Sequence, residues 1–428
     1  MMNRRNFIQG VASSITVAAS VSAAPVRTPR PRRVINSAAP RGDTLTVGVI
    51  GCGGRGSGAA ANILEASPDT KIIALGDAFP DRLASSRENL AKLGERGTVA
   101  ESSCFTGLDA YKAVLATDCD VVILATPPGF RPIHFAAAVE AGKHVFAEKP
   151  VAVDAPGIRS FIDSAHRATE RKLSVVAGTQ RRHEACYLEA MDLIHNGAIG
   201  RPLSARVFWN MGGLWSVEPR SDRSDVENQM RNWLYYTWLS GDHIVEQHVH
   251  NLDVANWAFE GLPTHVVSVG GRQARTAPIY GNIFDHFGSD LNYGDGRFAL
   301  SMARQQEGTP GRVEEFIHGE KGVAFLTSGS ARIEGENPWQ FSGKQRNPYV
   351  QEHIDLIASI RGGAYLNEAE RVAQSTMTAI MCRMAAYTGA ELDWGQALGS
   401  TELLMPQSIS FGPLAVAPVA IPGKTVFA

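Results

Sequence analysis

A glycine-rich turn near the start of the chain constrains the fold more than any other feature. The segment that begins at Val47 reads V-G-V-I-G-C-G-G-R-G, so a G-x-G-x-x-G motif directly follows an apolar run and precedes a helix-like stretch. Glycine permits the tight bend, the close approach of a phosphate to the backbone, and the packing of the helix against the strand. The free N–H groups and the positive dipole end of the helix then favour an anion. This strand–turn–helix context predicts a dinucleotide-binding site at Gly51, Gly53, Gly54, Arg55 and Gly56.

A carboxylate further along the chain bears on which dinucleotide is bound. The second apolar run ends in A-L-G-D at Asp77. A carboxylate at this position can accept both ribose hydroxyls of the adenosine half, and it repels a 2′-phosphate. NAD is therefore the expected cofactor, and NADP is the alternative. A competing interpretation is that Asp77 only opens the loop before Pro80.

Apolar runs alternate with helix-like stretches in the first part of the chain. The runs lie at residues 46–50, 71–75, 121–125, 144–146 and 174–177. This alternation predicts a parallel sheet with helices on both faces, the doubly wound arrangement of a Rossmann domain. The unbroken apolar run V-V-I-L-A at residues 121–125 is typical of a strand buried on both faces.

Beyond about Gln180 the pattern changes to α+β. Strands are expected at residues 203–209, 264–270, 297–303, 312–318 and 322–326, and helices at 183–195, 241–257, 348–360 and 367–388. The predicted fold class is α/β, an N-terminal Rossmann domain plus a C-terminal α+β domain with a mostly antiparallel open sheet. The expected parts are a signal peptide (1–24), a linker (25–43), the Rossmann domain (44–180), a substrate-binding and oligomerisation domain (181–395), and a C-terminal arm or tail (396–428).

The N-terminus has the composition of an export signal. Arg4 and Arg5 precede an apolar stretch from Val11 to Ala24 with small residues near its end. A basic region, a short apolar region and an A-x-A-like site indicate a signal peptide, and the paired arginines resemble a twin-arginine signal. We expect cleavage near Ala23 and a periplasmic or otherwise exported protein. The alternative is an unstructured start in which the arginines occur by chance.

Charge and cysteine content bear on the possible partners. The 428-residue chain has a net charge of −2, which gives no reason to expect nucleic acid or an anionic membrane as a partner. Its five cysteines are odd in number and form no C-x-x-C pair, so neither a disulfide framework nor a cysteine-rich zinc site is expected. The expected partner is a small-molecule carbohydrate.

Three further motifs follow the glycine turn. They are T-P at Thr126 and Pro127 with His134 downstream, then A-G-K-H-V, then E-K-P at Glu148 and Lys149. In this order they resemble the glucose–fructose oxidoreductase, inositol dehydrogenase and rhizopine-catabolism family (Gfo/Idh/MocA). E-K-P directly after an A-G-K-H-V strand is the most specific part of the likeness.

The resemblance covers nearly all of the chain from residue 45 to residue 388. It implies a sugar or polyol substrate and a second domain whose open sheet commonly forms subunit contacts, hence a homo-oligomer. It also implies that Lys149 lies beside the nicotinamide and the reacting carbon. Thr126, Pro127, His134 and Glu148 are then expected at the cofactor.

A histidine-rich helix is the second informative segment. Expected at residues 241–257, it places Glu246 and His250 four residues apart on one face. Sugar dehydrogenases of the family carry D-x-x-x-H followed by x-x-D here, so the resemblance implies that His250 removes the hydroxyl proton, with Asp253 three residues on. Glu246 stands where the family often has Asp, and we expect it to orient the imidazole or stabilise its protonated form.

A metal site is the competing interpretation of this helix. His243, Glu246 and His250 offer imidazole and carboxylate groups, which are good ligands. We expect no metal, because hydride transfer to nicotinamide needs none and the H-E-x-x-H motif is absent. Asp242 and His243 are instead expected to contact substrate or to support the structure.

Candidate substrate contacts lie in two further segments. The loop around Arg231 and Trp233 offers ring faces and a cation, which suit the C–H faces and hydroxyls of a sugar, although aromatic residues equally pack cores and subunit interfaces. Gln180, Arg181 and His183 follow the last Rossmann strand and lie near the expected cleft.

Three functions of different class fit these residues. The first is an NAD(P)-dependent oxidoreductase that transfers hydride between the cofactor and a hydroxyl carbon of a sugar, sugar derivative or polyol, with Lys149, His250 and Glu246 as catalytic residues. The second is a redox-neutral enzyme that retains its NAD and either couples two sugar half-reactions or cleaves a glycoside by transient oxidation. The third is a non-catalytic sugar- or cofactor-binding protein. Export favours the second because free NAD is scarce outside the cytoplasm, and Lys149 together with His250 argues against the third.

Overall fold

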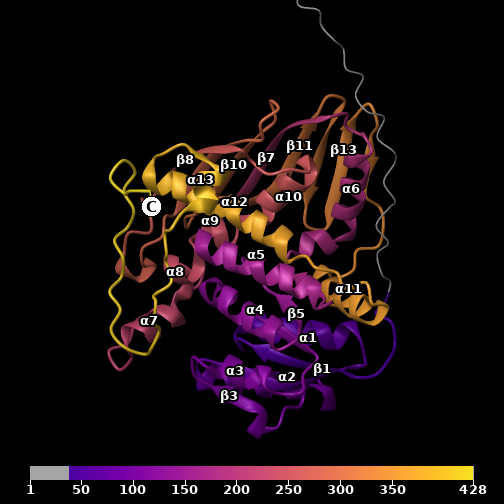
Figure 1. Ribbon diagram of the computed structural model, residues 1–428. Helices are drawn as coiled ribbons and strands as arrows, with labels where there is room; N and C mark the ends of the chain where they lie inside the picture. The colour runs from indigo at the N-terminus through magenta and orange to yellow at the C-terminus, as the bar shows by residue number, and fades with distance from the viewer. Residues whose placement is uncertain (1–37, 428) are drawn as a thin grey trace, which may run out of the picture.

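A computed structural model describes residues 38–427 of the protein. The predicted signal peptide and most of the predicted linker lie outside the described residues. Two sheets organise the rest: a parallel sheet in the N-terminal part, at the bottom of Figure 1, and a larger sheet above it, with helices packed between them.

The first sheet confirms the predicted Rossmann domain. Its order is β3-β2-β1-β4-β5-β6, and every neighbouring pair is parallel. The strands are β1 Leu45–Ile50, β2 Thr70–Asp77, β3 Cys104–Thr106, β4 Val121–Leu124, β5 His144–Ala147 and β6 Val175–Ala177. The strand order reverses between β1 and β4, and ligands of such sheets bind at this switch point, outside the carboxyl ends of the strands.

Helices cover both faces of this sheet (Figure 1). They are α1 Gly54–Ala66, α2 Pro80–Ala91, α3 Ala110–Leu115, α4 Arg131–Glu140 and α5 Ala155–Glu170, with short 3-10 turns η1 Glu95–Gly97, η2 Glu101–Ser103 and η3 Pro128–Phe130. All four residues of β4 are fully buried, as an unbroken apolar run in a doubly covered sheet requires.

The second sheet has nine strands and is mostly antiparallel, as predicted. Its order is β14-β13-β12-β11-β7-β10-β9-β8-β15, and only the β7–β10 pair is parallel among its described pairs. The strands are β7 Pro202–Met211, β8 His265–Gly271, β9 His286–Asn292, β10 Phe298–Gln305, β11 Arg312–Gly319, β12 Gly322–Thr327, β13 Ser330–Gly335, β14 Trp339–Gln340 and β15 Leu392–Asp393.

Helices pack on one face of this second sheet only. α6, α10 and α12 contact β13, β7 and β8 respectively, and α12 also packs on α5 of the first domain. The helices of this part are α6 Ala185–His195, α7 Asp225–Arg231, α8 Thr237–Ser240, α9 His243–Glu246, α10 Val249–Phe259, α12 Ala369–Thr388 and α13 Trp394–Gly399, with η4 Gln180–His183, η5 Trp233–Tyr235 and η6 Pro278–Tyr280.

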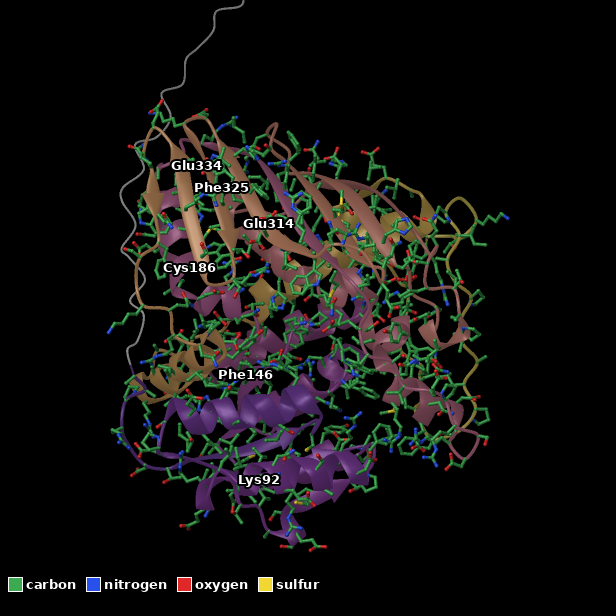
Figure 2. The ribbon with its side chains drawn as sticks, turned by 180° about the vertical axis from the view of Figure 1, so that it is seen from behind. Lys92, Phe146, Cys186, Glu314, Phe325 and Glu334 are labelled. Atoms are coloured by element: carbon green, nitrogen blue, oxygen red, sulfur yellow. The ribbon has the colours of Figure 1, made fainter. Side chains whose placement is uncertain are left out.

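The opposite face of the second sheet is open, as Figure 2 shows around Glu314, Phe325 and Glu334. Along β10, Ala299 and Ala303 are fully buried, whereas Leu300 and Met302, which lie between them in the strand, are 46% and 48% exposed. This alternation follows from the period of two in a strand with one covered face.

One helix departs from the predicted boundary at residue 180. α11 (Pro348–Gly362) packs on α1, and its residues Val350, Ile354 and Ile357 are buried in the same cluster as the core of β1 and α1. The Rossmann core is therefore completed by a helix from the C-terminal part of the sequence. Beyond α13, residues 400–427 form no helix or strand.

Candidate active site

The glycine turn has the geometry that a dinucleotide requires. A Cβ on Gly51, whose φ is +97°, would stand 2.6 Å from the backbone of Ala125 and Thr126, and one on Gly56 would stand 1.7 Å from the Gly51 carbonyl oxygen. These two glycines therefore allow the bend and the packing of α1 on the strand. At Gly53 and Gly54 a Cβ would meet no described atom within 4 Å, so the backbone is open to an approaching phosphate.

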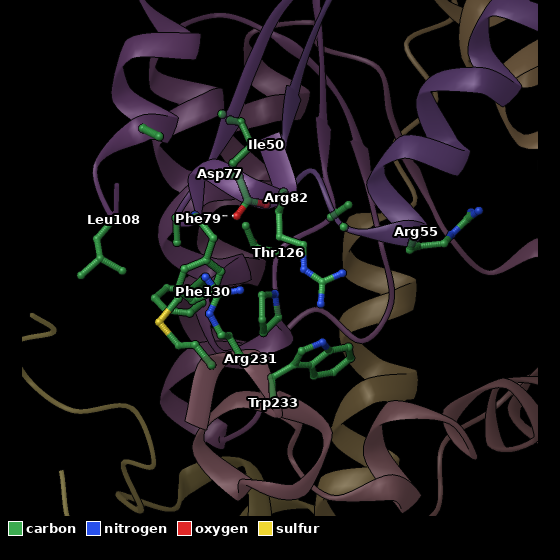
Figure 3. A pocket seen from close by; sticks show the side chains of 18 of the residues that line it. Ile50, Arg55, Asp77, Phe79, Arg82, Leu108, Thr126, Phe130, Arg231 and Trp233 are labelled. Carbon is green, nitrogen blue, oxygen red and sulfur yellow. Dashed lines mark hydrogen bonds between the residues drawn. The ribbon is translucent and has the colours of Figure 1, made fainter. Parts of the chain in front are cut away.

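A cavity of about 580 Å³ lies at the switch point of the sheet (Figure 3). It is lined by eight of the residues predicted to meet the cofactor: Gly51, Gly53, Gly54, Arg55, Asp77, Thr126, Pro127 and His134. Gly56, Glu148 and Lys149 are outside this lining. The turn, the helix end and the cavity together fit an NAD-type dinucleotide.

Asp77 lies in the cavity wall at the end of β2. Its carboxylate accepts hydrogen bonds from the backbone N–H groups of Cys52 (2.6 Å) and Phe79 (2.9 Å). Burial raises the pKa of Asp77, and these two bonds oppose that rise. Each carboxylate oxygen keeps a second lone pair, which can accept a hydrogen bond from a ribose hydroxyl.

The Thr-Pro turn is held by the histidine that follows it. The Thr126 hydroxyl and His134 Nδ1 are 3.1 Å apart, and the ring packs against Tyr111 and Phe130 at 4.4 and 5.8 Å between centroids. Burial lowers the pKa of His134 to about 3, so the imidazole is neutral. A neutral ring can hold the turn in place without adding charge to the cavity.

Lys149 follows β5, at the same edge of the sheet as the glycine turn. Its Nζ donates to the backbone oxygen of Glu246 (2.6 Å) and to the carboxylate Oε1 of Glu246 (2.9 Å). The neighbouring Glu148 forms an ion pair with Arg55 of the glycine turn. Glu148 of the E-K-P motif is thus connected to the cofactor loop, and Lys149 to the second domain.

The predicted helix over residues 241–257 is in fact two helices, α9 and α10, which is a correction to the sequence analysis. Gln247 and His248 interrupt it, because their side chains are bonded to β10: Gln247 to Gln305, and His248 Nε2 to the Ser301 hydroxyl at 2.7 Å. The amide of His248 bonds to the His243 carbonyl, one residue further back than in an α-helix.

The break changes the expected relation between Glu246 and His250. Glu246 is paired with Lys149, and within the described residues Nδ1 of His250 is buried without a hydrogen-bond partner. The His250 ring stacks on Trp209 at 5.7 Å. Burial lowers the pKa of His250 well below its usual range, and the charges of Lys149, Arg181 and Arg55 act in the same direction. The imidazole of His250 is therefore neutral.

Other predicted residues near this helix are held in buried polar contacts. Asp253 accepts from Arg182 at 2.7 and 3.0 Å and from Ser375 at 2.6 Å. Asp242 caps α9 and accepts from the Phe284 amide (2.7 Å) and the Tyr387 hydroxyl (2.5 Å). These contacts support the structure around the site.

The remaining substrate candidates are divided between the two domains. His243 is buried against Phe287, and Arg181 is paired with Glu315. His183 lies between Asp355 (2.6 Å) and Glu368 (3.3 Å). The charges of these two carboxylates outweigh the effect of burial and raise the pKa of His183 to about 9. Gln180 lies in η4, and its Oε1 is buried without a described partner.

Arg231 and Trp233 lie on the cofactor side of the molecule. Both line the dinucleotide cavity, and Arg231 forms a bidentate ion pair with Asp81 of α2 at 2.9 and 2.8 Å. Their place in the cavity wall associates them with the cofactor more than with the reacting carbon.

Several residues of the cavity wall were not predicted from the sequence, among them Phe79, Arg82, Trp215 and Met230, and neither was Trp209 beside His250. Phe79 and Arg82 follow Asp77 directly in α2 and its approach, so a search of the first turns after the second strand would have found them. Trp215 and Met230 line the cavity from a distant segment, and no local signal marks them. Trp209 lies on β7, where its ring stacks on His250.

Comparison with known families agrees with this geometry. Residues 45–176 match the model of an oxidoreductase family with an NAD-binding Rossmann fold, and residues 187–325 match the GFO/IDH/MocA C-terminal domain. Together the two matches cover more than half of the chain. The chain belongs to the Gfo/Idh/MocA family.

Curated Gfo/Idh/MocA relatives differ in what their names describe. A glycosyl hydrolase family 109 protein of Porphyromonas gingivalis is 28% identical over 217 residues, which is 50% of this chain and 45% of that protein. Inositol 2-dehydrogenase 4 of Saccharopolyspora erythraea is 31% identical over 159 residues, 37% of this chain and 43% of that one. The matches therefore span less than half the length of either relative.

The fold is shared with solved structures of the same architecture. A crystal structure of aldose-aldose oxidoreductase from Caulobacter crescentus, complexed with glycerol, superposes with a TM-score of 0.65 over 82% of this chain and 99% of that one, at 17% identity. At this identity the likeness concerns the Rossmann and open-sheet arrangement.

Two further observations concern metals and membranes. Within residues 38–427, no group of three or more His, Cys, Asp or Glu side chains is arranged to hold a metal ion. In the same part of the chain, no helix combines the length and the apolar character that a membrane crossing needs.

Proposed function

We propose that this protein transfers a hydride between a bound nicotinamide dinucleotide and a hydroxyl-bearing carbon of a sugar, sugar derivative or polyol. The observation that carries the proposal is the position of Lys149, whose Nζ bonds to Glu246 four residues before the buried His250, while the adjacent Glu148 pairs with Arg55 of the glycine turn. When bound, the nicotinamide accepts or returns the hydride. The inositol 2-dehydrogenase relative supports a polyol or sugar as the other reactant.

The side chains divide the proton chemistry between them. His250 takes the proton of the substrate hydroxyl as the carbon–hydrogen bond breaks, which a buried neutral imidazole can do. Lys149 donates a hydrogen bond to the same oxygen and stabilises the charge that develops on it. Glu246 holds the ammonium in place through its carboxylate and its backbone oxygen.

The test is a set of variants assayed with a panel of sugars and polyols, with reduced nicotinamide followed by its absorbance. His250→Ala and Lys149→Ala should each lose about 10²–10⁴ in turnover and still bind dinucleotide. Glu246→Gln should lose less, because an amide oxygen and the backbone oxygen still accept from Nζ. His248→Ala is the matched control, since His248 bonds to Ser301 away from the site. An inactive His248 variant beside a fully active His250 variant would refute the assignment.

A redox-neutral version of this chemistry is the second candidate. The glycosyl hydrolase family 109 relative supports it, because hydrolysis involves no net oxidation. In that case the hydride removed from the substrate returns to it before product leaves. The two candidates differ in whether reduced nicotinamide accumulates when substrate is added to stoichiometric NAD.

We also propose that the protein is exported by the twin-arginine route, from Arg4, Arg5 and the short apolar stretch that follows them. Replacing both arginines with lysine should leave the protein in the cytoplasm with its N-terminal segment intact. Cell fractionation and mass measurement check this. Unchanged delivery of the shortened protein to the periplasm would contradict it.

A further inference from the structure

The dinucleotide cavity has a wall that the Rossmann domain does not supply. Six of its lining residues come from the second domain (Figure 3): Trp215, Ser216, Val217, Met230, Arg231 and Trp233. The Tyr235 hydroxyl donates to the carbonyls of Leu214 (3.1 Å) and Trp215 (3.0 Å). The Val217 amide donates to the Asn232 side chain at 2.9 Å. These bonds join residues 214–239 into one unit, here called the cover.

The polar contact between the cover and the Rossmann domain is an exposed ion pair. Arg231 pairs with Asp81, and its guanidinium lies 4.1 Å from the centre of the Phe79 ring. The Asp81 side chain is 59% exposed. An ion pair so accessible to water contributes little to closure by itself.

The C-terminal residues 400–423, here called the strap, bind the cover from outside. The Val226 amide donates to the Gly412 carbonyl at 3.2 Å. The Gln229 side chain donates to the Leu414 carbonyl at 2.7 Å, and the Leu414 amide donates to Asp225 at 3.1 Å. In Figure 1 the yellow strap runs from α13 past α8 to α7 and then returns toward the C-terminus.

Both ends of the strap are anchored elsewhere. At its start, Arg159 of α5 donates to the Ser400 carbonyl at 2.9 Å, and the Leu404 amide donates to Asp154 at 2.9 Å. At its end, the Gly423 amide donates to the Thr388 carbonyl of α12 at 2.8 Å. The cover is therefore held by a segment that is bonded to the Rossmann domain on one side and to α12 on the other.

An apolar cluster joins the strap, the cover and the cavity wall. It contains Phe79 and Phe130 of the Rossmann domain, Met230, Leu234 and Trp238 of the cover, and Leu404, Met405, Ile409 and Leu414 of the strap. The packing is tightest at Gly129, where a Cβ would stand 2.5 Å from the Met405 sulfur and 2.2 Å from the Trp238 carbonyl oxygen. Moving the cover off the cavity would expose this cluster, because its members come from all three parts.

We propose that the strap keeps the cover closed over the dinucleotide, so that the cofactor exchanges slowly with solution and stays bound from one turnover to the next. The proposal rests on the dinucleotide site of the proposed function and adds how that site keeps its ligand. A retained cofactor must be returned to its starting redox state in the same site. The strap therefore favours reactions that give the hydride back to the substrate or to a second carbonyl compound.

The strap can be tested by cutting it after the protein has folded. A recognition sequence for a specific protease, inserted between the exposed residues Gln407 and Ser408, allows the full-length protein to fold and load with labelled NAD first. Release of the label into excess unlabelled NAD is then timed before and after cleavage. Cleavage should speed release by about tenfold or more, the equivalent of one or two net hydrogen bonds. The Phe411 ring of the strap lies 6.0 Å from the Phe79 ring of the cavity wall, so Phe411→Ser in the uncut protein should act in the same direction, as should Asp225→Ala.

The controls separate the strap from general loosening. The same recognition sequence placed in the exposed turn between Asp295 and Gly296 should leave release unchanged on cleavage, and so should Val416→Ser on the strap's exposed side. Release that stays slow after complete cleavage and removal of the C-terminal fragment would overturn the strap and leave the proposed function standing. A protein that binds no NAD before cleavage would overturn both.

Discussion

Asp77 and Arg82 lie in the same cavity wall and carry opposite charges (Figure 3). The balance between these charges decides how tightly a dinucleotide with a 2′-phosphate binds. The carboxylate lies at the end of β2 and is anchored by two backbone N–H groups. A phosphate beside it would place two like charges in partial desolvation, which typically costs a few kcal/mol. The arginine offers the group that NADP-binding sites of this fold use.

We therefore expect NAD to bind more tightly than NADP, and Asp77→Asn to reduce that preference. Asparagine removes the charge and keeps one of the two acceptor oxygens, so it can still accept from either the Cys52 or the Phe79 amide. Titration of both dinucleotides against each variant measures the change. The double variant Asp77→Asn with Arg82→Ala should lose the gain in NADP binding. Tighter binding of NADP by the unmodified protein would show that Arg82 outweighs Asp77.

At the residue scale, the sequence predicts the parts of the site that adjoin one another along the chain. The glycines, Asp77, Thr126 and Lys149 each follow a strand of one parallel sheet, and the carboxyl ends of such strands share an edge. Trp215 and Trp209 escape prediction because their positions depend on how the second domain packs. The pairing of Glu246 with Lys149 could not be predicted from the sequence for the same reason.

At the scale of elements, strands are easier to predict than the interruption of a helix. Continuous apolar runs mark β1, β2 and β4. The break between α9 and α10 has no such mark. It arises from side-chain bonds to β10, which lies about fifty residues further along the chain.

The open face of the second sheet carries the next prediction. Val267, Val269, Phe298, Leu300 and Met302 are 42–70% exposed on β8 and β10, the two strands that flank β9, and so large a group of apolar side chains marks an interaction site. We propose that a second copy of the chain covers it. Leu300→Glu combined with Val269→Glu should yield a smaller species in size-exclusion chromatography with light scattering, with NAD binding retained.

A matched control for this prediction is Val416→Glu, which adds the same charge at an apolar side chain that is 49% exposed on the C-terminal segment. It should leave the assembly unchanged. If the unmodified protein is monomeric at every concentration tested, the open face has another partner.

At the scale of the whole molecule, several buried histidines make stability depend on pH. Burial lowers the pKa of His243, His248, His250 and His353, so these rings stay neutral in the folded protein, while in the unfolded chain they titrate near the ordinary value of 6.5. A depressed folded pKa contributes stability above the unfolded pKa, and that contribution is lost as the pH falls below it. We expect unfolding to become easier between pH 7 and pH 5.

His353 allows the origin of this effect to be measured. Its ring packs on Phe146 at 4.3 Å, and neither nitrogen has a described partner. His353→Phe should keep the packing and reduce the loss of unfolding free energy between pH 7 and pH 5 by up to about 2 kcal/mol. Urea unfolding at both pH values gives the comparison. An unchanged pH dependence would mean that this ring is already protonated when folded, or that its neighbours compensate.

The late return of α11 to the first sheet has a consequence for how the chain is made. The helix that completes the core around β1 and α1 leaves the ribosome almost three hundred residues after that strand. The strand pairs of the second sheet likewise join β7 to β10 and β11 across about a hundred residues. Contacts between such distant segments form slowly and only after synthesis has passed them. We therefore expect the nascent Rossmann segment to expose the apolar surface that α11 covers until nearly the entire polypeptide has been translated, and to be most prone to aggregation during this interval.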